Sequence, residues 1–128
     1  MTAEEKLLLI DLCARLSSEL KVKTSKGDGV LCGIDLIPDG AYLGISINGA
    51  VQDYFEFRDI KPYLRPMESM TEEEDKEFAM LQTDFYTDSF LYPIPASNMI
   101  DWLNSHHFDY RDLIPWGLAL EAPADMYK

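Results

Sequence analysis

The stretch VLCGIDLIPDGAYLGISINGAVQDYFEF (residues 30–57) decides the fold. Its apolar residues come in short runs separated by turn residues, with Pro38-Asp39-Gly40 after the first run and Asn48-Gly49 after the second. Asn-Gly accommodates the positive φ angles of a tight hairpin turn, and short runs bounded by such residues are typical of antiparallel strands. The stretch therefore predicts three strands, over residues 30–36, 41–47 and 51–57.

Two more short strands are expected on either side of this stretch, near residues 20–24 and within 58–64. Gly33 and Gly44 fall inside predicted strands, where glycine indicates a bulge or a bend. Four or five short strands joined by tight turns form an antiparallel meander, and bends allow such a meander to curl. We therefore expect a small SH3-like barrel over about residues 22–65.

Helical patterns lie on both sides of the predicted barrel. Residues 3–20 carry leucines at helical spacing after Thr2, a suitable N-cap. Thr71 and Glu74 have the spacing of a capping box, which predicts a helix from there to about Tyr86. A third helix is expected from about Ala96 to Ser105. The buried face of the second helix is predicted to consist of Phe78, Leu81 and Phe85, with Ala79 and Met80 as further candidates.

The predicted fold class is thus α+β: an N-terminal helix, a small antiparallel β-meander or SH3-like barrel, and a helical C-terminal half. We expect one compact domain over residues 1–128, with the barrel part in 1–66 and the helical part in 67–128. After the third helix, Asp109 is expected to cap a last short helical turn. Residues 118–120 are then expected to be extended, and residues 123–128 to be a tail.

The excess negative charge is concentrated in the second half of the chain. Residues 1–65 hold ten acidic and eight basic residues, a net charge of −2, whereas residues 66–128 hold thirteen acidic and three basic residues, a net charge of −10. Binding to nucleic-acid phosphates depends on Lys and Arg contacts, so direct nucleic-acid binding is not expected. The charge is explained either by solubility alone or by a basic protein partner.

Hydropathy and cysteine usage indicate a cytoplasmic protein. The longest apolar run is Leu7–Ile10, resumed after Asp11, and a membrane span needs roughly 20 apolar residues. The residues before this run are acidic, unlike the basic start of a signal peptide. Cys13 and Cys32 both lie in apolar stretches, so we expect two reduced core thiols rather than a disulfide.

The segment HHFDYRD (residues 106–112) is the densest group of chemically active side chains. A histidine there could act as a general base or metal ligand oriented by Asp109, with Arg111 holding an anion. Adjacent histidines do not share a helical face, however, and no second Cys/His cluster completes a zinc site. His106 also follows Met99 and Leu103 at helical spacing, so it could simply end the helix. We therefore predict no catalytic, cofactor-binding or metal site, and no cofactor.

The acidic run at residues 72–77 allows two interpretations. Acidic side chains in a first helical turn are favoured by the helix dipole without any partner. The wider acidic bias keeps an interface with a basic partner plausible. The candidate interaction surface then consists of Glu72, Glu73, Asp75, Glu77, Asp84, Asp88, His106, His107, Asp109 and Arg111.

Several segments resemble an uncharacterised protein family of gut anaerobic bacteria and their phages. They are KPYLRPM (residues 61–67), SMTEEE (69–74), DWLN (101–104), HHFDYR (106–111) and GLALEAP (117–123). The chain departs from the family pattern around Ile114-Pro115-Trp116, where a more ordinary charged helical stretch would be expected. The resemblance implies a phage or mobile-element context, and the family has no known activity or active site to carry over.

Three functions are consistent with these observations. The first is a non-enzymatic protein-interaction module. The second is an acidic nucleic-acid mimic that inhibits a host protein, as in anti-defence proteins, and it predicts salt-sensitive binding to a basic enzyme. The third is a small hydrolase built on His106, His107 and Asp109, which requires these side chains to converge in one pocket. An enzyme is less expected than an interaction protein.

Overall fold

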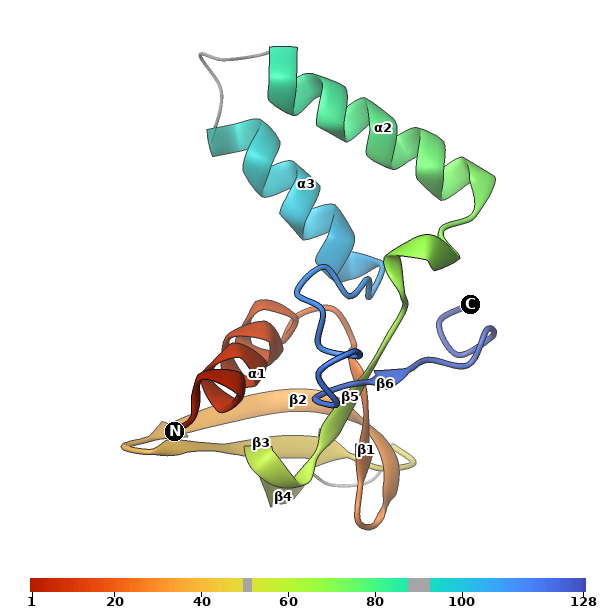
Figure 1. Ribbon diagram of the computed structural model, residues 1–128. Coiled ribbons are helices and arrows are strands. Elements are labelled where there is room, and N and C mark those ends of the chain that lie inside the picture. The colour runs from red at the N-terminus through yellow and green to blue at the C-terminus, as the bar shows by residue number, and fades with distance from the viewer. Residues whose placement is uncertain (50–51, 88–92) are drawn as a thin grey trace.

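The computed structural model describes residues 1–49, 52–87 and 93–128, and the chain folds as an α+β protein (Figure 1). It has an N-terminal helix, an open mixed sheet and two helices in its C-terminal half. The helices are α1 (Ala3–Ala14), α2 (Glu72–Thr87) and α3 (Pro93–Ser105), and two short 3-10 turns are η1 (Phe57–Asp59) and η2 (Met67–Ser69). The strands are β1 (Lys21–Thr24), β2 (Gly27–Ile37), β3 (Gly40–Ser46), β4 (Asp53–Glu56), β5 (Lys61–Leu64) and β6 (Leu120–Glu121).

The strands form one six-stranded sheet in the order β4-β3-β2-β1-β5-β6, and this sheet does not close into a barrel. The first five strands pair antiparallel, as expected, but β6 pairs parallel with β5 through Tyr63–Leu120 and Leu64–Glu121. Closure of a barrel would require β4 to pair with the opposite edge. Because β6 returns from the C-terminal half and occupies the place beside β5, the predicted SH3-like barrel is wrong.

The strand region otherwise follows its sequence signals. The pairing of β2 with β3 shifts register between Leu31 and Gly33, which confirms the bulge predicted at Gly33. Asn48 and Gly49 have φ angles of 54° and 71°, as a tight turn requires. Ile45 nevertheless pairs with Asp53, so the connection is longer than a two-residue turn. Residue 51, where the third strand was expected to begin, lies outside the described residues.

Helix α1 is shorter than the predicted 3–20. It begins with a complete Thr2–Glu5 capping box and ends at Ala14, where Arg15 caps it. The chain then turns, with Glu19 at a φ of 53°, so that Leu20 enters the core just before β1. The helix ends early because Leu20 and Val22 are needed in the sheet core, and tertiary packing overrides helix propensity.

The core lies between α1 and the inner face of the sheet. It is built mainly of aliphatic residues and Phe57, and its least exposed members are Leu12, Leu20, Val22, Ala41, Leu43, Ile45, Phe57, Leu64 and Leu113. Both cysteines are free but exposed, so their predicted core position is wrong. Asp11 and Leu12 are the buried residues at this turn of α1, so the next residue, Cys13, is directed to solvent. Cys32 follows the buried Leu31 at the bulge of β2 and is exposed for the same reason. None of the helices in the described part of the chain has the length and hydropathy of a membrane span.

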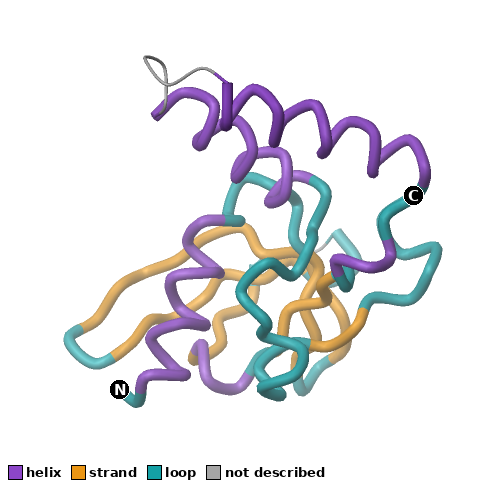
Figure 2. Tube along the Cα trace, turned by 45° about the horizontal axis from the view of Figure 1, so that its top comes forward, coloured by secondary structure: helices purple, strands orange, loops and turns teal. Residues whose placement is uncertain are grey.

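Helices α2 and α3 form a hairpin that stands away from the sheet, here called the arm (residues 72–87 and 93–105; Figures 1 and 2). Phe78, Leu81 and Phe85 are only half-buried, and Phe78 stacks on Trp102 of α3. Ala79 and Met80 are exposed, so the predicted buried face is narrow and only partly shielded. No described residue of α2 is buried. Pro93 and Pro95 lie in the first turn of α3, where proline is tolerated, so this helix begins earlier than predicted.

Residues 123–128 are not the free tail that was expected. They form a turn that packs back on the sheet, and the Tyr127 hydroxyl donates a hydrogen bond to the Tyr63 carbonyl at 2.7 Å. The extended segment predicted at residues 118–120 is present in part, as β6.

Two glycines of β2 give a test of sheet packing. A Cβ at Gly29 would lie 2.6 Å from Ile45 Cγ2 and 2.7 Å from the Ser46 carbonyl oxygen, whereas at Gly33 the nearest atom would be 3.9 Å away. We expect Gly29→Ala to lower the free energy of unfolding by about 1–3 kcal/mol because backbone must shift. Gly33→Ala is the matched control, with a change of about 0.5 kcal/mol or less. Urea unfolding would measure both, and equal effects would contradict the close packing at Gly29.

Candidate functional site

The arm is joined to the sheet through Arg65, at the end of β5. The Arg65 guanidinium donates two hydrogen bonds of 2.7 Å to the Glu74 carboxylate, in the first turn of α2. It also lies over the Phe108 ring, 4.2 Å from its centroid. The backbone of Arg65 donates to the His107 carbonyl and accepts from the Asp109 amide, both at 2.8 Å. One residue therefore fixes the entrance of the arm and the segment that follows it.

We call Arg65 and its contacts with Glu74, Phe108 and the backbone of residues 107 and 109 the Arg65 joint. Glu74 serves two purposes in it. Its carboxylate accepts from the Thr71 amide while its own amide donates to Thr71 Oγ1, which completes the predicted capping box. The Arg65 guanidinium, assisted by the Thr71 amide, lowers the pKa of Glu74 to about 2. A bidentate arginine–carboxylate pair fixes orientation as well as distance, so α2 leaves the sheet in a defined direction.

A column of aromatic rings continues from Arg65 into the arm. Phe108 stacks on Trp102 of α3, and Trp102 stacks on Phe78 of α2, each with 5.7 Å between ring centroids. The His106 ring lies 4.2 Å from that of Trp102. The indole nitrogen of Trp102 donates to the Glu77 carboxylate at 2.9 Å, so the column also ties the two helices together.

The acidic members of the candidate surface gather on the arm. Glu72, Glu73, Asp75 and Asp84 are exposed along α2. Glu77 is also exposed but accepts the Trp102 hydrogen bond. Asp88 lies outside the described residues. Met80 is 69 % exposed, on the flank of α2 that carries Glu73, Glu77 and Asp84 at helical spacing.

The other candidate residues lie after α3 and do not share this surface. His106 is half-buried, with its Nδ1 2.9 Å from the Trp102 carbonyl oxygen. His107 is 8 % exposed and stacks on Tyr127 with 3.6 Å between centroids. Asp109 is buried, and its two carboxylate oxygens accept from the Leu113 and Ile114 amides at 2.9 Å. Each side chain is therefore held in a separate structural contact.

Arg111 leads to a buried ionic cluster. Its Nε donates to Asp11 at 3.2 Å, and the other oxygen of Asp11 accepts from Arg15 Nε at 2.9 Å. Asp11 and Arg15 are fully buried, and Arg15 Nη2 donates to the Phe108 carbonyl at 2.6 Å. Burial raises the pKa of Asp11, against the opposing effect of Arg15. The sequence offered one signal for this pair, since positions 11 and 15 share a helical face with Leu8 and Leu12.

Two buried nitrogens near this cluster, Arg15 Nη1 and His107 Nδ1, have no hydrogen-bond partner among the described residues. Burial, with the nearby charge of Arg15, lowers the pKa of His107 to about 4. The positive charges of His106, Arg65 and Lys21 lower the pKa of His107 further, each by a smaller amount. His107 is therefore neutral at physiological pH, inside a locally cationic region of an acidic protein.

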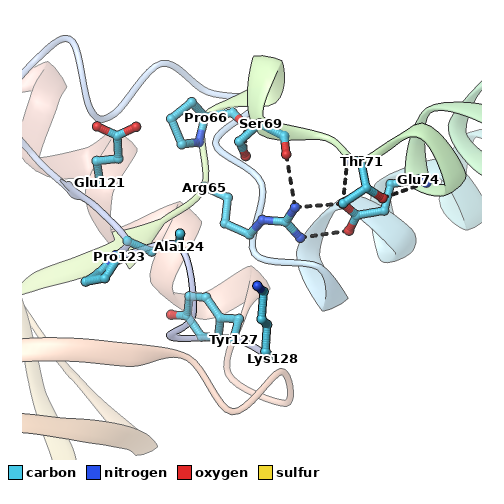
Figure 3. A pocket seen from close by; sticks show the side chains of 11 residues that line it. Arg65, Pro66, Ser69, Thr71, Glu74, Glu121, Pro123, Ala124, Tyr127 and Lys128 are labelled. Carbon is cyan, nitrogen blue, oxygen red and sulfur yellow. Dashed lines mark hydrogen bonds and ion pairs between the residues drawn. The ribbon is translucent and has the colours of Figure 1, made fainter.

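A cavity of about 730 Å³ lies between the segment that follows β5 and the segment that follows β6 (Figure 3). The Arg65–Glu74 pair forms one side, and Tyr127 and Lys128 form another. A second cavity of about 400 Å³ is also lined by Tyr127 and Lys128, together with His107 and Lys21. Within residues 1–49, 52–87 and 93–128, no group of three or more His, Cys, Asp or Glu side chains is arranged to hold a metal ion.

Comparison with protein-family models, with curated proteins and with solved structures finds no match to this chain. Function is therefore inferred from the geometry, which offers an acidic arm held by the Arg65–Glu74 pair and two cavities beside Tyr127.

The buried ion pair predicts a large loss of stability when one partner is removed. Arg15→Met leaves the Asp11 carboxylate buried beside Arg111 alone and should lower the free energy of unfolding by about 3–5 kcal/mol. Lys26→Met, which removes the exposed ion pair with Asp53, is the control and should cost about 0.5 kcal/mol or less. Chemical denaturation measures both, and similar small losses would show that the Asp11–Arg15 pair contributes little.

The lowered pKa of His107 predicts acid sensitivity. The unfolded chain protonates this ring near its ordinary pKa of 6.5, whereas the folded chain does so near 4. The unfolded state therefore binds more protons in this window, and stability falls as pH drops from 6.5 towards 4. His107→Phe keeps a ring against Tyr127 but cannot titrate, so wild type should lose about 2 kcal/mol more than this variant. Thermal unfolding that shows parallel pH curves for the two proteins would contradict this.

Proposed function

We propose that this protein is a non-enzymatic protein-interaction module whose arm docks on a basic surface of another protein. The single observation that carries this is α2, a sixteen-residue helix without a buried residue among those described, which presents its acids to solvent. Acidic residues in the first turn are favoured by the helix dipole. Asp84 lies well beyond that turn and gains nothing from the dipole, so the charge extends further than helix stability requires.

The joint supports the same proposal. A surface that binds a partner loses less entropy when its direction is already fixed. Arg65 holds the start of α2 by two charged hydrogen bonds, and the stacked rings of Phe108, Trp102 and Phe78 hold α3 against α2. The acidic face is thereby presented at a defined angle to the sheet, although the arm itself is thin.

A narrower form of this proposal is that the arm imitates nucleic acid and inhibits a host protein. Its support is the same acidic face, and competition by duplex DNA for the partner distinguishes it from docking elsewhere on that partner. The hydrolase alternative has less support, because His106, His107 and Asp109 are each engaged in a separate contact. We therefore do not propose an enzyme.

Neutralising the arm tests the proposal. Glu73→Gln/Asp75→Asn/Asp84→Asn removes three charges from α2, and Glu19→Gln/Asp35→Asn/Asp59→Asn removes three exposed charges from the sheet half. Each protein is immobilised and exposed to a lysate of the source organism at about 50 and about 500 mM salt, where screening differs greatly. We expect basic proteins captured at low salt by the wild type and the sheet-half variant, and at least about tenfold less capture by the arm variant.

Identification by mass spectrometry and binding of the purified partner complete the test. Binding of the purified basic partner that survives in the arm variant, or that is equally tight at both salt concentrations, would exclude the arm as the docking surface. Equal loss in both variants would indicate dependence on total charge rather than on the arm.

A further inference from the structure

Tyr127 occupies a socket that is built entirely by other parts of the chain. The Tyr63 carbonyl of β5 accepts from the tyrosine hydroxyl at 2.7 Å, and the Lys21 amide of β1 donates to the same oxygen at 3.0 Å. The face of His107, in the segment after α3, stacks on the ring. We call these three groups the phenol socket. All of them remain in place if residues 123–128 move away, because strand pairing and the Arg65 joint hold them.

The socket is chemically selective. A phenol hydroxyl both donates and accepts a hydrogen bond, and here a carbonyl and an amide satisfy one function each. A phenylalanine ring could stack on His107 but would remove the hydroxyl from both backbone groups, which is costly where they are partly shielded from water. Tyr127 is half-buried, and this burial raises the pKa of its hydroxyl to about 12.

The segment that supplies Tyr127 is attached lightly. Besides the bonds of Tyr127, the Met126 carbonyl accepts a hydrogen bond from Lys21 Nζ at 2.7 Å, which links this segment to β1. The Met126 and Lys128 amides donate within the segment, to Pro123 and Asp125. The ladder of β6 ends before it, at Glu121. The segment can therefore leave without breaking the sheet.

The two cavities show what its departure would open. They measure about 730 and 400 Å³ and share Tyr127 and Lys128 in their linings, so this short segment separates them. In Figure 3, Tyr127 and Lys128 lie along one side of the larger cavity, opposite the Arg65–Glu74 pair. We therefore expect the departure of this segment to join the two cavities, with the phenol socket between them.

We propose that the phenol socket is a recognition site for a tyrosine in a short peptide turn of a partner chain, and that Tyr127, itself in such a turn, holds the site closed as an internal competitor. This site is separate from the acidic arm. Lys21 borders the socket, and Arg15 and Arg65 act electrostatically on its histidine. Acidic residues beside the partner's tyrosine are therefore favoured, as Asp125 stands near Tyr127 in this chain.

The test uses the full chain with Tyr127→Ala and an acetylated peptide of residues 123–128, Pro-Ala-Asp-Met-Tyr-Lys. The reporter is the Lys21 amide in ¹H–¹⁵N NMR spectra, because this group donates to the phenol. We expect the peptide to return the Lys21 signal towards its position in the unaltered chain. The same peptide with Phe for Tyr should shift this signal less, and with Ala not at all. The unaltered chain should bind the tyrosine peptide at least about tenfold more weakly, because a tethered competitor acts at millimolar effective concentration.

Tyr127→Phe provides a second receptor in case Tyr127→Ala does not fold, since it retains the ring on His107 and removes only the hydroxyl. It should bind the tyrosine peptide more tightly than the unaltered chain does. If a folded receptor shows no shift of its Lys21 amide signal with the tyrosine peptide at millimolar concentration, the socket is not a recognition site. An equal response to the alanine peptide would overturn its selectivity, and equal binding by the unaltered chain would overturn the role of Tyr127 as a competitor.

Discussion

Arg15 brings a guanidinium into the interior at the place where the parts of this protein meet. It binds Asp11 within α1, the Phe108 carbonyl after α3, and lies 5.1 Å from the centroid of the Tyr110 ring. A buried charge is tolerated only when it is paired and hydrogen-bonded. The segment after α3 must therefore take the one path that brings the Phe108 carbonyl to this group. That path places Phe108 under Arg65 and His107 against Tyr127. The arm and the phenol socket thus both depend on a charge far from either in the sequence.

The local elements were predictable because their signals are local. The capping residues Thr2 and Thr71, the bulge at Gly33 and the turn at Asn48 all act on neighbouring backbone, and each is found where it was expected. The early end of α1 and the open sheet were not predictable in this way. They depend on Leu20 entering the core and on β6 pairing with β5, and both are contacts between distant residues. Periodicity carries no information about which strand returns to which edge.

The candidate surface shows the same division. The acidic residues of α2 could be placed from the capping signal, and the structure brings them together on one helix. His106, His107 and Asp109 were grouped because they are adjacent in sequence, yet the turn after α3 directs each to a different neighbour. Tyr127 was missed altogether, because nothing in a short polar segment marks its single tyrosine as packed against the sheet. Its partners, Lys21 and Tyr63, lie on strands that meet only in the folded sheet.

The pairing of β5 with β6 has a further consequence. Arg65 bridges to Phe108 and Tyr63 pairs with Leu120, so the chain leaves the sheet and returns to it at nearly the same point. Everything between Arg65 and Phe108 is an insertion whose two ends are clamped together. The entropy of closing such an insertion changes only slowly with its length. The helices of the arm could therefore be lengthened, given different charged residues or replaced while the strand register stays the same. This topology separates a sheet of fixed register from an arm that can be exchanged without changing the sheet.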